Sequence, residues 1–168
     1  FTILFGSSAA LKQVHFKRRL AYSTVANLSY ILFGVTLMSE AGLNAGVLHM
    51  LFHSIIKIGA FFAAGAVLHN TGKEYISELD GLGKKMPVTF ITFTVFALSL
   101  TGIPLFNGFV SKWALCSAAA QNPDAASVIG IAVLLISALL TAIYMLNISV
   151  RAFFPKKGTD TASLEGIK

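Results

Sequence analysis

The chain has 168 residues, of which 55% are apolar and only 12% are charged. A soluble domain usually carries about 25% charged residues, so this composition excludes an ordinary water-soluble protein and favours a membrane protein. The formal net charge of +6 could suggest binding to nucleic acid, but the positions of the charges, described below, indicate membrane topology instead. The single cysteine, Cys116, excludes an internal disulfide.

The first apolar run covers residues 1–11 and is too short to span a bilayer. It does not resemble a signal peptide, because its positive charges follow the apolar stretch instead of preceding it. We therefore expect a truncated helix at residues 1–11, and we expect the chain to be an internal piece of a longer protein.

Three later apolar runs fit single membrane spans, since a spanning helix needs about 20 apolar residues. They cover residues 20–38, 43–69 and 127–154. Residues 1–154 are therefore predicted to form a partial membrane domain. Residues 155–168 are polar and are predicted to form a cytoplasmic loop or tail.

The apolar run at residues 88–120 is too long for one straight span and too short for two comfortable ones. Pro104 lacks the backbone N–H that a helix interior needs, and Gly102 and Gly108 weaken a helix on either side of it. Two alternatives follow from these residues. The run forms either two short helices joined by a turn, or one span made of two half-helices with an unwound link.

The distribution of basic residues favours the second alternative. Eleven of the thirteen Lys and Arg residues lie in segments 12–19, 70–87 and 151–168, and none lies in segments 39–42 or 121–126. If residues 88–120 cross once, all three basic segments lie on the same side, which the positive-inside rule makes the cytoplasm. The sequence thus predicts an all-α, polytopic transmembrane helix bundle with one discontinuous helix around residues 102–108. We expect a multi-pass protein of the inner (plasma) membrane, with the lipid bilayer and not nucleic acid as its surroundings.

The two remaining basic residues, Lys57 and Lys112, lie inside apolar runs. A lysine at the centre of a bilayer costs roughly 2.5–3.5 kcal/mol, so such residues are functional candidates by default. His49 and His53 precede Lys57 by eight and four residues, which places all three on one face of a helix. Histidine gains and loses protons near neutral pH, and this polar stripe is therefore a candidate proton relay. The alternative is that the histidines only join helices by hydrogen bonds and that Lys57 reaches the membrane surface.

Lys112 follows Gly108 by four residues and is expected in the first turn of the second half-helix. There, burial and the positive end of the helix dipole would both disfavour its charged form. We interpret Lys17, Arg18 and Arg19 first as topology signals, and Ser23, Asn27 and Tyr30 as packing or interfacial groups. No nucleotide loop, metal cluster or hydrolase triad is present in the sequence, so we assign no catalytic, cofactor-binding or metal-ligating residue.

Four segments resemble signatures of the antiporter-like, proton-translocating membrane subunits of respiratory complex I. This family also includes Mrp-type cation/proton antiporters and the membrane subunits of energy-converting hydrogenases. The matching segments are residues 17–24 (KRRLAYST), 49–57 (HMLFHSIIK), 81–87 (GLGKKMP) and 102–112 (GIPLFNGFVSK). The resemblance runs in order from residue 1 to about residue 154.

The resemblance implies a fold of two inverted five-helix repeats, each with one broken helix, of which this chain would supply most of the second. It also implies roles for individual residues. Lys57 would be the central lysine of the channel, flanked by His49 and His53, and Lys112 would exchange protons with the outer face. Lys17 would connect the two half-channels. The first repeat, with its buried glutamate–lysine pair, lies outside this chain. One branch of the family has glutamate where this chain has Lys112, and that branch is disfavoured.

The leading hypothesis is proton translocation by an antiporter-like subunit of an NADH–quinone oxidoreductase. Redox chemistry would occur in other membrane and redox subunits of the complex, and no cofactor is expected in this chain. The main alternatives are a subunit of an Mrp-type sodium/proton antiporter, which would carry Na⁺ as well, and a membrane subunit of an energy-converting hydrogenase. A third hypothesis is a structural membrane subunit that transports nothing.

Overall fold

The computed structural model of the protein describes residues 1–121 and 123–155. The predicted polar tail therefore lies, apart from Pro155, outside the described residues, and so do the three lysines in it. Six α-helices and two short 3-10 helices make up the described chain, and α3 and α6 are each long and apolar enough to cross a membrane. The α-helices are α1 (Thr2–Lys12), α2 (Phe16–Thr36), α3 (Glu40–Thr71), α4 (Pro87–Thr101), α5 (Asn107–Gln121) and α6 (Ala125–Phe153).

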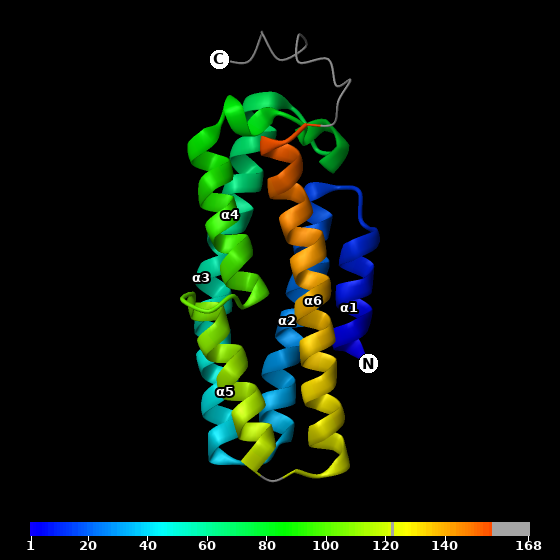
Figure 1. Ribbon diagram of the computed structural model, residues 1–168, viewed down its shortest axis with the longest axis vertical. Helices are drawn as coiled ribbons and strands as arrows, with labels where there is room; N and C mark the ends of the chain where they lie inside the picture. Colours follow the sequence, from blue (N-terminus) through cyan, green and yellow to red (C-terminus); the bar gives the residue numbers. More distant parts are fainter. Residues whose placement is uncertain (122, 156–168) are drawn as a thin grey trace.

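The helices run alongside one another as a bundle, and α4 and α5 lie end to end along its long axis (Figure 1). The two half-helices together match the length of α3, with the break near mid-height. The prediction of one discontinuous span in an all-α bundle is thus confirmed, and the alternative of two separate spans is not.

Local sequence explains where the helices begin and end. Pro87 occupies the first turn of α4, where a missing N–H costs nothing. Ser39 begins α3 by accepting the Gly42 N–H at 3.0 Å, and Gly72 ends it in the left-handed conformation with φ +67°. Asp124 begins α6 by accepting the Ser127 N–H at 2.7 Å, and hydrogen bonding to the side chain and then to the backbone of Ser127 lowers the pKa of the exposed carboxyl group.

The helices extend further than the apolar runs indicated. α2 begins at Phe16 instead of residue 20, so Lys17, Arg18 and Arg19 lie in its first turn and not in a loop. Lysine and arginine are good helix formers, so charge at the end of an apolar run does not terminate the helix. The long connection after α3 contains the 3-10 helices η1 (Ile76–Leu79) and η2 (Leu82–Lys84).

All the basic connections lie at one end of the bundle. The α1–α2 turn, the η1–η2 connection and the C-terminal end of α6 lie together at the top of Figure 1, and the α2–α3 and α5–α6 turns lie at the bottom. The basic-end connections also bind one another, because the Ile76 N–H donates to the Val14 carbonyl at 2.9 Å. The predicted segregation of charge to one end is therefore present in the fold.

The bundle has apolar side chains outside, and its interior combines two apolar clusters with a set of buried polar side chains. Leucine, isoleucine and phenylalanine residues cover the outer surface, as expected of helices that face lipid. The buried polar side chains come from all six α-helices and include the four residues Ser7, Asn27, His53 and Ser137. Because polar groups in a membrane face the bundle interior, this interior is where a site would lie.

Candidate functional site

Lys57 lies in the interior of the bundle, at the contact between α2 and α3. Its side chain is only 5% exposed. The Nζ group donates to the Leu20 carbonyl at 2.9 Å and to Ser23 Oγ at 2.7 Å. The alternative that Lys57 reaches the membrane surface is inconsistent with these contacts, because both acceptors are buried on the neighbouring helix.

The two histidines continue from Lys57 along the same face of α3. His49 and His53 are 2% and 4% exposed, and their rings are stacked with centroids 5.9 Å apart. The Nδ1 atom of His49 lies 2.9 Å from Ser111 Oγ on α5, so the row passes from α3 to the second half-helix. At 1.5 Å per residue, the stretch from His49 to Lys57 covers about 12 Å along the helix.

Lys112 lies at the break between the half-helices. Its Nζ donates to the carbonyls of Leu100 at 2.6 Å and Thr101 at 3.0 Å, the last residues of α4. These carbonyls are the negative end of the α4 dipole and favour the ammonium form. The expectation that Lys112 lies in the first turn of the second half-helix is wrong. The physical reason is that α5 begins at Asn107, so Lys112 lies in its second turn and the side chain extends back to α4.

The predicted helix-break residues occupy three different places at this site. Gly102 ends α4 with φ +91°, a conformation that strains any residue with a Cβ. Pro104 lies in the link between the helices, and Gly108 lies inside α5 with its N–H 3.3 Å from Ser99 Oγ. A side chain at Gly108 would collide with the Ser99 carbonyl, so this glycine allows the start of α5 to contact the end of α4.

Two residues of α2, Ser23 and Tyr30, belong to the site although the sequence analysis treated them as packing groups. Ser23 accepts from Lys57, as described above. The Tyr30 ring lies 5.3 Å from the His49 ring and 5.5 Å from Lys112 Nζ, measured to the ring centroid, and so it contacts both halves of the row. A signal was available in the sequence, because Ser23, Asn27 and Tyr30 follow the i, i+4, i+7 spacing of one helix face.

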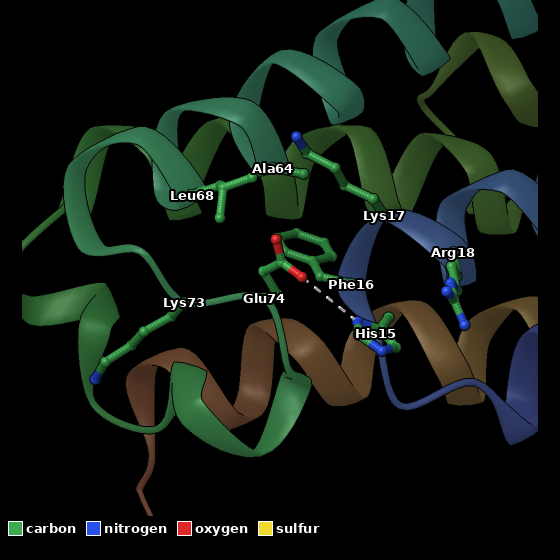
Figure 2. Close-up of a pocket in the computed structure, with 8 residues that line it drawn as sticks. All are labelled: His15, Phe16, Lys17, Arg18, Ala64, Leu68, Lys73 and Glu74. Carbon is green, nitrogen blue, oxygen red and sulfur yellow. Dashed lines mark ion pairs between the residues drawn. The ribbon is translucent and has the colours of Figure 1, made fainter.

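Lys17 is not brought into this buried row. It is exposed and lines a cavity of about 200 Å³ at the basic end, beside the His15–Glu74 ion pair. Figure 2 shows its side chain extending alongside α3 near Ala64. Within residues 1–121 and 123–155, the Lys17 amine has no hydrogen-bond or ion-pair partner.

Arg19, by contrast, is buried with 6% exposure and holds the basic end together. Its guanidinium donates to the carbonyls of Leu11 and Gln13 at the end of α1 and to the Tyr144 carbonyl of α6 at 3.1 Å. Arg19 therefore has a role beyond the predicted topology signal, because it satisfies orphan carbonyls at the end of α1 and links α1, α2 and α6. Its neighbours in sequence, Lys17 and Arg18, are exposed.

The described part of the chain contains no group of three or more His, Cys, Asp or Glu residues that could hold a metal ion. The expectation of no cofactor in this chain stays a prediction. The chemistry available at the site is proton exchange, since imidazoles and amines are linked by hydroxyl groups and backbone carbonyls in a buried row.

Comparison with known proteins gives related membrane subunits. The chain is 40% identical over 151 residues to the NADH-quinone oxidoreductase subunit N of Desulforudis audaxviator strain MP104C, covering 90% of this chain and 30% of that protein. It is 31% identical over 161 residues to the NAD(P)H-quinone oxidoreductase chain 4 3 of Trichormus variabilis, covering 94% of this chain and 30% of that protein. The chain therefore spans about a third of the length of these relatives.

Solved structures show the same fold. A chain of the Mrp complex from Dietzia sp. DQ12-45-1b superposes with a TM-score of 0.84 at 37% identity, covering 90% of this chain and 28% of that one. A chain of the membrane-bound sulfane sulfur reductase, an archaeal respiratory membrane complex, superposes with a TM-score of 0.85 at 32% identity, covering 97% of this chain and 34% of that one. The family described as NADH:quinone oxidoreductase/Mrp antiporter, transmembrane, matches residues 1–141. This match covers most of the chain, which therefore belongs to that family and is part of a membrane-embedded protein.

Proposed function

We propose that this chain carries part of a proton pathway across the membrane, within an antiporter-like subunit of an NADH–quinone oxidoreductase. The observation that carries the proposal is a row of titratable side chains inside the bundle, in which the buried His49, His53 and Lys57 are followed by the partly buried Lys112. Retaining two amines at such depth is costly, and a structural role would not require both to lie beside protonatable imidazoles. The similarity to subunits of NADH-quinone and NAD(P)H-quinone oxidoreductases supports this class of complex.

The proposed path leads along α3 and then to the break between α4 and α5. Protons would exchange between Lys57 and the two histidines, and would pass by Ser111 and Tyr30 to Lys112. Lys112 lies at the helix break, where unwound backbone is tolerated in a membrane only against protein or a hydrated cavity. From there the path would lead toward the face opposite the basic end.

Lys17 would serve as the connection between this half-channel and its neighbour. It lies one helical turn from Leu20, whose carbonyl binds the Lys57 amine. We further propose that the basic end faces the cytoplasm of a plasma membrane and that the subunit assembles with other membrane and redox subunits.

The second candidate is an Mrp-type sodium/proton antiporter subunit. The observation that favours it is the superposition on a chain of the Mrp complex at 37% identity. Protons would use the same residues, and Na⁺ would be exchanged by the assembled complex.

The test is the removal of each buried amine in the full-length subunit of the intact complex. Lys57→Ala and Lys112→Ala should each abolish proton uptake into inverted membrane vesicles, because each removes the amine at one end of the row. Lys85→Ala, which alters an exposed lysine at the basic end, serves as the control and should leave uptake unchanged. Full proton uptake by both buried-amine variants would overturn the proposal. Uptake that depends on Na⁺ and not on NADH would select the second candidate.

A further inference from the structure

Helices α2 and α3 contact each other at Lys57 with Ser23 and at His49 with Tyr30, and Asn27 and His53 lie between these two contacts along their helices. From the first contact to the second, the residue number falls from 57 to 49 along α3 and rises from 23 to 30 along α2, so the two helices are antiparallel. The position four residues before Lys57 is His53, and the position four residues after Ser23 is Asn27. Both side chains are buried, and Asn27 is completely so.

The orientation of the Asn27 amide is set by its own helix. Its Nδ2 donates to the Ser23 carbonyl at 2.8 Å. The Ser23 carbonyl oxygen can only accept a hydrogen bond. Reversing the Asn27 amide would place its Oδ1, which is also an acceptor, against that oxygen. The Oδ1 atom is therefore the part of the amide that remains available to accept a hydrogen bond.

The polar atoms around this point lack partners within the protein. Among the described residues, Asn27 Oδ1 and both ring nitrogens of His53 are buried without a hydrogen bond. Lys57 uses two of its three N–H donors, on Leu20 and Ser23, and keeps the third. Buried polar groups are rarely unsatisfied in folded proteins, and a buried water that joins two to four of them is the usual solution.

We propose that Asn27 is a positioning residue that, together with His53 and Lys57, binds an ordered water molecule between α2 and α3. The water accepts the third Lys57 N–H, donates one hydrogen to Asn27 Oδ1 and donates the other to the unprotonated nitrogen of His53. This inference rests on the proposed function, since it supplies the step between two members of the row. Side chains one turn apart have Cβ atoms about 5–6 Å apart, a separation at which one bridging water completes the connection.

The proton step balances within this arrangement. The Lys57 ammonium gives a proton to the water, and the water gives its His53-bound hydrogen to the ring nitrogen. The amine becomes neutral, the imidazole becomes imidazolium, and the water is regenerated. Asn27 exchanges no proton, and its Oδ1 keeps the second hydrogen of the water out of the path, so that only one hydrogen is aimed at His53.

The charged and titratable groups around His53 are few. His49 and Lys57 face it from α3, and Lys112 acts on it from α5. α2 contributes Ser23, Asn27 and Tyr30, and α4 has no titratable residue. A carboxylate placed at position 27 would therefore be the one negative charge among these groups.

The test compares Asn27→Leu, which removes the acceptor, with Asn27→Asp, which retains it, in the intact complex. Asn27→Leu should lower the rate of proton uptake about tenfold or more, as expected from losing a buried hydrogen bond to the transferring water. Asn27→Asp should restore uptake with its pH profile displaced to higher pH, because a carboxylate favours the imidazolium form of His53. The matched control is Asn70→Leu, since Asn70 makes the same bond to the carbonyl four residues earlier but is exposed at the end of α3.

Wild-type uptake and pH profile in Asn27→Leu would overturn the inference. If Asn27→Leu does not assemble, an unshifted pH profile in Asn27→Asp overturns it instead. Lys57→Ala is measured in parallel to separate the two proposals. Full uptake in Lys57→Ala contradicts the proposed function, whereas blocked uptake in Lys57→Ala with unaffected Asn27 variants contradicts only the bound water.

Discussion

At the scale of single residues, the two lysines of the row are held in different ways. Lys57 binds one carbonyl and one hydroxyl of an intact helix, whereas Lys112 binds the free carbonyls that exist only because α4 ends at Thr101. The amine of Lys112 thus depends on the helix break, and the break depends on Gly102. A Cβ atom at Gly102 would lie 3.0 Å from Cδ of Lys112.

Gly102→Ala should therefore affect both stability and transport. A left-handed conformation costs a residue with a Cβ roughly 1–2 kcal/mol, and the added methyl group would also displace the Lys112 side chain. Gly72→Ala is the matched control, because Gly72 has φ +67° and no atom within 4 Å of the added Cβ. Both variants should lower the thermal midpoint of the complex, but only Gly102→Ala should slow proton uptake. Equal uptake in the two variants would show that the Lys112 position does not depend on this glycine.

The residues of the row could be predicted from sequence more easily than their partners. Lys57, His53 and His49 stood out because charged or titratable groups inside an apolar run are rare. Ser23 and Asn27 did not, because a serine or asparagine in a membrane helix is common and becomes significant only when the facing helix is known. The direction of the Lys112 side chain also required the structure, since the sequence leaves the first residue of α5 undefined.

At the scale of elements, the contact between α2 and α3 sets the alignment of the site. Near the end of α2, the helices approach so closely that a Cβ atom on Gly34 would lie 2.7 Å from the Gly42 carbonyl oxygen. This close approach brings Tyr30 against His49 one turn away. Small residues at helix crossings serve this purpose in membranes, because lipid provides no hydrophobic force between helices.

Gly34→Ala should separate α2 from α3. Overpacking of this kind typically costs about 1–3 kcal/mol, and it should also weaken the contact between Tyr30 and the row. Gly65→Ala on α3 is the control, because a Cβ atom there meets nothing within 4 Å. The measurement is the thermal midpoint of the complex together with proton uptake. A variant at Gly34 that is as stable and active as the Gly65 control would show that this crossing does not position the site.

The elements themselves were predictable to within a few residues, because bilayer thickness fixes the length of a span. Their ends were not, since Arg19 and its neighbours continue α2 beyond the apolar run. Arg19 is tolerated there because its guanidinium donates hydrogen bonds to backbone carbonyls at the end of α1 and in α6. The contact with α6 joins segments that are far apart in the sequence. Residue patterns within one helix do not contain that information.

At the scale of the whole molecule, the one-sided distribution of basic residues corresponds to one end of the bundle (Figure 1). This arrangement predicts opposite accessibility for the two ends in a cell. In a Cys116→Ser background, Lys85→Cys should react with a membrane-impermeant maleimide only in inverted vesicles, and Asp124→Cys only in intact cells or spheroplasts. Labelling of both cysteines from the same side would contradict a single broken span at residues 87–121.

The central claim is that Lys57 releases and regains a proton, and is not only a buried positive charge. The most direct measurement is the number of protons moved per electron by the purified complex in liposomes, with Lys57→Arg compared with wild type. Arginine keeps the charge and the hydrogen-bond donors but does not lose its proton in proteins. We expect the complex with Lys57→Arg to assemble and to move few or no protons along this path. A wild-type ratio of protons to electrons in Lys57→Arg would contradict it.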